Sequence, residues 1–146
     1  MCALLPANMK SIPQTTNAAV LRMDFTDENA WQSICAAIRR PVGEFQVHVD
    51  FISDPTFEGI GADGLLSLIP KKYGHSFIFA VDHRALSRPD HPILVMDLYE
   101  ERGRTFRVIP SEMWGVENNL SIANMDFAEF ADSADPDGIF RGFPES

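Results

Sequence analysis

The sequence predicts one α/β domain of three layers, with a mixed, mostly five-stranded sheet and helices packed on it. Strand and helix patterns alternate over the first half of the chain, which is typical of right-handed βαβ units. A nearly continuous apolar run at 75–81 indicates a central strand that is buried on both faces. The link over 82–92 is too short for a helical crossover, so the strands after it are expected to be antiparallel.

The first βα unit is predicted from an apolar strand over 20–25 and a helix behind it. Thr26 is expected to cap that helix, with acidic residues in its first turn. Pro41 ends the helix after two arginines. Four residues share its apolar face at helical spacing: Trp31, Ile34, Cys35 and Ile38.

Two further strands are predicted in the first half of the chain. Residues 45–52 alternate strictly between apolar and polar side chains, which is typical of a half-buried strand near a sheet edge. A short helix over 62–69 follows and stops at Pro70, and the buried strand at 75–81 comes next.

The second half of the chain is predicted as a hairpin followed by helices. Residues 93–99 and 104–109 form the hairpin, and residues 111–125 have roughly helical apolar spacing. Asparagines within 111–125 indicate a broken helix or a turn, because their amides compete with backbone hydrogen bonds. Asp126 and Glu129 have the spacing of a capping box, and an apolar tail over 139–143 is expected to pack on the domain.

Composition limits the class of protein. Twelve basic and 21 acidic residues give a net charge of −9, which argues against nucleic acid as a partner. No run of 18 apolar residues occurs, so no membrane span is expected. The two cysteines are too few for a disulfide framework, which favours a reduced, cytoplasmic chain. We expect a disordered lead-in over 1–17, a single domain over 18–146, and a monomer or an edge-strand homodimer.

One glycine motif indicates a nucleotide site. Gly59, Gly61 and Gly64 match G-x-G-x-x-G between a strand and a helix, and Asp82 follows at nearly the spacing of the ribose-binding acid. Residues 53–58 separate the motif from its strand, and the following helix is short. The favoured alternative is therefore a flexible loop whose Asp63 or Gly61 caps a short helix.

Carboxylates mark the ends of four predicted strands: Asp24, Asp50, Asp82 and Asp97. At the carboxyl ends of parallel strands such groups can hold Mg²⁺ and orient a phosphoryl group. Asp also begins turns and caps helices, which is the structural alternative. The strand at 93–99 is expected to be antiparallel, which would place Asp97 at the opposite end.

The C-terminal quarter is strongly acidic. Residues 110–146 contain eight acidic residues and one basic residue, Arg141. Such a surface can steer a basic protein partner, whereas the alternative is a solvated face with some acids paired to the arginines of the hairpin. The candidate docking residues are Glu112, Glu117, Glu129 and Asp132.

Several segments resemble an uncharacterised family of small bacterial α/β proteins, a domain of unknown function frequent in Streptomyces-type actinobacteria. The resemblance lies in WGVENNLSIANMDFAEFAD and DPDGIFRGFP near the C-terminus, and in VLRMDFTDENAW and GHSFIFAVD before them. It covers most of residues 18–144. It implies a bacterial, stand-alone domain and supplies no catalytic residues.

These observations favour a non-enzymatic binding or regulatory module, similar to an immunity protein, that uses the acidic C-terminal surface. The reason is charge asymmetry without a catalytic motif, and no cofactor is expected. The alternative is an enzyme that binds a nucleotide or phosphoryl ligand through Asp24, Asp82 and the glycine loop, with Mg²⁺ held by the acidic cluster.

Overall fold

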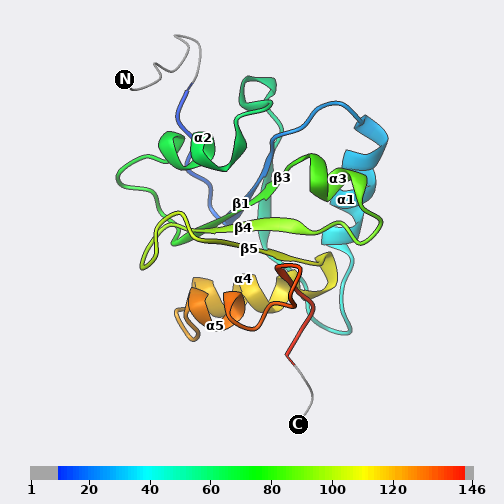
Figure 1. Cartoon of the computed structure of the whole chain (residues 1–146), viewed down its shortest axis with the longest axis vertical. Coiled ribbons are helices and arrows are strands. Elements are labelled where there is room, and N and C mark those ends of the chain that lie inside the picture. The colour runs from blue at the N-terminus through cyan, green and yellow to red at the C-terminus, as the bar shows by residue number, and fades with distance from the viewer. Residues whose placement is uncertain (1–9, 144–146) are drawn as a thin grey trace.

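The computed structural model describes residues 10–143 and contains a six-stranded mixed sheet in the order β2-β1-β3-β4-β5-β6 (Figure 1). β1 pairs in parallel with β2 and β3, and β5 pairs in parallel with β6. The β3–β4 and β4–β5 pairs are antiparallel, as the short link after residue 82 predicts. The strands are β1 Ala18–Arg22, β2 Val49–Ile52, β3 Phe77–Val81, β4 Ile93–Asp97, β5 Thr105–Val108 and β6 Ile139–Phe140.

Helices cover the two faces of the sheet unequally. α1, α3, α4 and α5 pack on one face with the larger core cluster, and α2 packs on the other face with the smaller one. Figure 1 shows α2 on the opposite side of β4 and β5 from α4 and α5. The helices are α1 Glu28–Arg39, α2 Gly61–Leu68, α3 His83–Ser87, α4 Met113–Ser121 and α5 Phe127–Ala131; Pro55–Phe57 (η1) and Pro110–Glu112 (η2) are 3₁₀ turns. No helix within residues 10–143 is long and apolar enough to cross a membrane.

The predicted position of the buried strand is confirmed. β3 lies between β1 and β4, and all five of its residues are buried. Phe77 and Phe79 face the larger core cluster, whereas Ile78 faces the α2 cluster, so the strand is apolar on both sides. β2 lies at the edge of the sheet and is half-buried.

Two local predictions near β2 and α1 are corrected. β2 begins at Val49 rather than at residue 45, because Phe45 pairs with Val42 in an isolated bridge and stacks on Trp114 with ring centroids 4.1 Å apart. The cap of α1 is Asp27, whose carboxylate accepts the Ala30 N–H, whereas Thr26 donates to Asp24. A carboxylate satisfies this helix end directly.

The chain packs earlier than the predicted boundary at residue 18. Ile12 is buried and donates its N–H to the Leu68 carbonyl at 2.9 Å, and the Asn17 N–H donates to Asp50. Residues 10–17 therefore lie against the domain instead of forming a disordered lead-in. Residues 1–9, which that lead-in also included, lie outside the described residues.

The second half of the chain contains one strand that was not predicted and confirms two predicted features. A sixth strand, β6, replaces part of the expected apolar tail. α4 ends at Ser121, and Ala123 has a φ of 55°, so the expected break in the asparagine-rich segment is confirmed. Asn119 stabilises the break, because its side chain donates to the Gly115 carbonyl and accepts the Asn124 amide. Glu129 accepts the Asp126 N–H, as a capping box requires.

We expect amide hydrogen exchange to be slower in β3 than in β2. Interior strands open only in large unfolding events, whereas edge strands open locally. Native-state exchange of the full chain, measured by NMR, tests this order. Equal or slower exchange in Val49–Ile52 than in Phe77–Val81 would contradict it.

Candidate functional site

The candidate site follows from the strand order around β1. The chain leaves β1 through α1 on one face to reach β2, and returns through α2 on the other face to reach β3. β1 and β3 therefore flank a point where the crossover direction reverses. Open α/β sheets bind ligands outside the carboxyl ends of strands at such a point.

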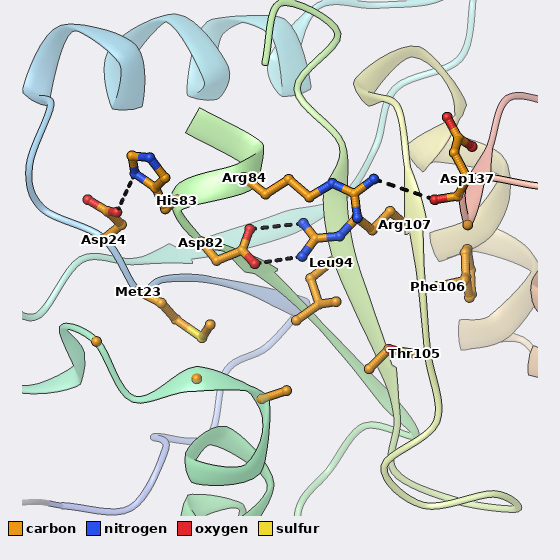
Figure 2. A pocket seen from close by; sticks show the side chains of 14 residues that line it. Met23, Asp24, Asp82, His83, Arg84, Leu94, Thr105, Phe106, Arg107 and Asp137 are labelled. Carbon is orange, nitrogen blue, oxygen red and sulfur yellow. Dashed lines mark hydrogen bonds and ion pairs between the residues drawn. The ribbon is translucent and has the colours of Figure 1, made fainter. Parts of the chain in front are cut away.

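A crevice of about 600 Å³ occupies this position (Figure 2). Asp24 follows β1 and Asp82 follows β3, and both line the crevice. Gly59 and Gly61 approach from the start of α2, and Leu94 of β4 forms part of the wall. Asp24, Asp82 and the first two motif glycines thus meet in one cavity, whose volume suits a small molecule.

Asp82 is held by Arg107 from β5. The guanidinium of Arg107 donates to both carboxylate oxygens, at 2.9 and 2.6 Å, and also to the Pro92 carbonyl. Asp82 also caps α3 by accepting the Ala85 N–H. Burial raises the pKa of Asp82, but the hydrogen bonds and charge of Arg107 outweigh it, so the pKa lies below its usual value.

Asp24 faces His83 rather than Asp82. One carboxylate oxygen of Asp24 accepts the Thr26 N–H at 2.8 Å and its hydroxyl at 2.6 Å, and the other lies 3.1 Å from His83 Nδ1. Burial raises the pKa of Asp24, and the Thr26 and His83 hydrogen bonds lower it further than burial raises it. His83 is mostly exposed, so an incoming ligand can reach its ring.

The three motif glycines have different roles. Gly59 and Gly61 have φ values of 73° and 66°, which residues with a side chain rarely adopt, and both line the crevice. Gly64 does not line the crevice; it lies within α2, where a Cβ would come 3.1 Å from Ile60 Cβ. α2 starts without a side-chain cap, so its first N–H groups remain available near the crevice.

Arg84 supplies a cation that the protein does not neutralise. Its guanidinium contacts only the Asp137 carbonyl, at 3.4 Å, and forms no ion pair within residues 10–143. Figure 2 shows Arg84 extending across the crevice toward Asp137. Arg84 and Arg107 differ in this respect, because Arg107 is fully engaged by Asp82.

The four carboxylates at the predicted strand ends do not form one metal site. Asp50 accepts the Asn17 N–H, and Asp97 lies at the opposite end of the sheet, as the antiparallel direction of β4 requires. Within the described part of the chain, no group of three His, Cys, Asp or Glu residues is placed to hold a metal ion. The structure thus brings Asp24 and Asp82 into one crevice, and leaves Asp50 and Asp97 outside it.

The candidate docking acids have unequal exposure. Glu117 is corrected from a surface acid to a buried one, because only 7% of it is exposed and it accepts the His48 N–H and the Ser121 hydroxyl. Glu112 is half-buried, and burial raises its pKa. Glu129 and Asp132 remain exposed, although Glu129 caps α5 and Asp132 pairs with Arg104.

The crevice residues that the sequence did not predict include Arg84, Thr105 and Arg107. Arg107 carried a signal, since a charged residue between Phe106 and Val108 points to the face opposite theirs and needs a partner there. Arg84 carried no comparable signal, because α3 has only five residues and its position depends on the fold.

We expect Arg107→Met to destabilise the protein at pH 7 by about 2 kcal/mol, since Asp82 would keep a partly buried charge without its partner. Stability from a lowered pKa is present above the unfolded Asp value of about 4 and is lost as the pH falls through the folded value. The difference from wild type should therefore shrink in acid. Urea unfolding from pH 7 to pH 3 measures it.

Arg84→Met is the matched control for this prediction. It removes the same charge from an arginine without an ion pair, and should change the free energy of unfolding little. Equal losses for both variants, or a difference that does not depend on pH, would show that the Asp82–Arg107 pair is unimportant.

We expect Glu117→Ala to lower the free energy of unfolding by about 2 kcal/mol, because the His48 N–H and the Ser121 hydroxyl lose their acceptor. Asp132→Ala removes an exposed acid from the same part of the chain and should leave stability nearly unchanged. Chemical denaturation of both variants makes the comparison. A Glu117→Ala variant as stable as wild type would contradict the buried role.

Comparison with known proteins places the chain in a family. Residues 17–143 match the family model described as Domain of unknown function (DUF6924). The match spans every strand of the sheet and all residues of the crevice. No curated protein matches the sequence. The expected membership in a family of unknown function is confirmed, and the chain belongs to the DUF6924 family.

Proposed function

We propose that the protein binds a small molecule bearing a phosphate or carboxylate group in the crevice between β1, β3 and α2. The observation that carries this proposal is the convergence of Arg84, which has no ion pair within residues 10–143, with the backbone of Gly59 and Gly61 in one cavity at the crossover reversal. These groups come from separate parts of the chain, and the fold alone brings them together. The position is the one where open α/β sheets bind ligands.

The anionic character of the ligand follows from the donors that the crevice offers. Arg84 has no carboxylate partner within the described residues, and the uncapped start of α2 presents N–H groups near Gly61. A helix start favours anions through its N–H groups and dipole. Asp24 and His83 can accept or donate hydrogen bonds to hydroxyl groups of the same ligand.

Ligand binding should appear as stabilisation. We expect ATP, AMP, NAD or inorganic phosphate to raise the melting temperature, with about 2.7 kcal/mol gained at a concentration of 100 times Kd. The effect should persist in EDTA, since the described residues gather no three-ligand metal site. Stabilisation that requires Mg²⁺ would instead support the Mg²⁺-dependent enzyme. No shift at millimolar ligand would contradict binding in the crevice.

Charge-matched variants locate the site. Arg84→Ala should weaken binding about tenfold in calorimetric titrations, the equivalent of one charge-assisted hydrogen bond. Lys71→Ala removes the same charge from an exposed residue beyond the carboxyl end of α2 and should bind normally. Equal weakening in both variants would indicate nonspecific attraction instead.

We propose as a second candidate a non-enzymatic, immunity-protein-like module that binds a basic protein in the cytoplasm of an actinobacterial cell. The net charge of −9 supports it, as do the exposed carboxylates of Glu129 and Asp132. Burial of Glu117 and partial burial of Glu112 leave fewer exposed carboxylates on the C-terminal helices than the sequence indicates. A basic partner therefore needs further acidic surface.

A further inference from the structure

Two hollows meet at the end of the sheet opposite the ligand crevice. One, of about 260 Å³, lies between the turn after β4 and the segment joining α4 to α5. The other, of about 640 Å³, extends from it toward the start of β1. They share the lining residues Ser76, Phe77, Leu120 and Ala123, so together they form one groove.

The smaller hollow offers apolar surface. Met125 and Phe127 line it with Leu120, and the exposed ring of Tyr99 stands at its edge. Tyr99 is 75% exposed, an unusual exposure for a large side chain beside an apolar hollow. Such a hollow can take an aliphatic or aromatic side chain of a partner.

Hydrogen bonds to the Asp97 carboxylate hold the backbone of the turn that carries Tyr99. Asp97 is buried, and its two carboxylate oxygens accept the N–H groups of Tyr99 at 2.9 Å and Glu101 at 2.8 Å. The backbone of the turn is therefore held at the rim, so little backbone order would be lost when a partner binds there.

The Asp, Glu, Lys and Arg residues that line the two hollows have one sign, although the exposed Arg102 lies in the same turn as Glu100. Asp97, Glu100 and Asp126 line the smaller hollow and Glu117 lines the larger, whereas no Lys or Arg is among the described residues that line either. Glu100 and Asp126 are exposed on opposite sides and form no ion pair within residues 10–143. An apolar hollow between unpaired carboxylates is complementary to an apolar side chain flanked by cations.

We propose that this groove binds a basic segment of a partner protein, with an apolar side chain in the smaller hollow and Lys or Arg beside Glu100 and Asp126. This inference rests on the second candidate function, a basic partner, and gives it a surface that the C-terminal acids alone do not provide. It is independent of the ligand crevice, which lies at the other end of the sheet.

Peptide pools test the groove with the isotope-labelled full chain by NMR. One pool of short peptides is randomised over Lys, Arg, Leu and Phe; a second replaces Leu and Phe with Ser and Gly; a third replaces Lys and Arg with Glu and Asp. The first pool should change the amide chemical shifts of residues 97–101 and 120–127. It should bind about fivefold or more tightly than the second pool. The third pool and spermine should not shift them.

Variants separate the groove from general acidity. Glu100→Lys and Tyr99→Ala should each weaken the first pool about fivefold, the equivalent of roughly 1 kcal/mol. Glu44→Lys makes the same charge change at an exposed residue outside both hollows, and should bind normally. The unfolding transitions of all three variants are compared first.

The proposal would be overturned by no amide shifts with the first pool at millimolar concentration, by equal shifts with spermine, or by equal weakening in Glu44→Lys. Shifts confined to Glu129 and Asp132 would also overturn the groove, but would leave the second candidate function standing. Binding in the crevice is read separately, from Arg84→Ala.

Discussion

The ion pair between Asp82 and Arg107 ties together the parts of the fold that make the crevice. Asp82 ends β3 and begins α3, and Arg107 lies on β5, with β4 between them in the sheet. One pair thus fixes the end of a parallel strand, the start of a helix and a strand of the antiparallel half.

The mixed sheet separates two kinds of surface. The end that contains the carboxyl ends of β1 and β3 has glycine backbone, an unpaired arginine and carboxylates that already have partners. The opposite end has an apolar hollow with carboxylates and no arginine or lysine among the described lining residues. A small anion and a basic protein segment would therefore approach opposite ends, and one protein could bind both at once.

The fold was largely predictable because the spacing of apolar residues along the sequence indicates which side chains are buried. The continuous apolar run of β3 and the helical stripe of α1 each have one simple interpretation, and both are confirmed. The alternating pattern at 45–48 predicted a strand that does not form there. Phe45 instead stacks on Trp114. β6 was not predicted because a strand of two residues is too short to show an alternating pattern of apolar and polar side chains.

The site was only partly predictable for a similar reason. Asp24, Asp82, Gly59 and Gly61 could be named because strand ends and glycines are visible in sequence. Which acids are exposed depends on tertiary packing, and so Glu117 was misplaced. Arg84 reaches the crevice only through the strand order, which local sequence does not encode, whereas the alternation around Arg107 indicates its face of the sheet but not its partner.

The place of β6 has a consequence for how the chain folds during synthesis. Ile139 and Phe140 complete the sheet beside β5, and Arg141 pairs with Asp135 and Asp137 directly around them. β6 follows β5 in the chain with α4 and α5 between them, so the edge of β5 stays open during synthesis until β6 has emerged and pairs with it. An open strand edge invites pairing with other chains. The nascent protein is thus more prone to self-association in the interval before β6 pairs with β5.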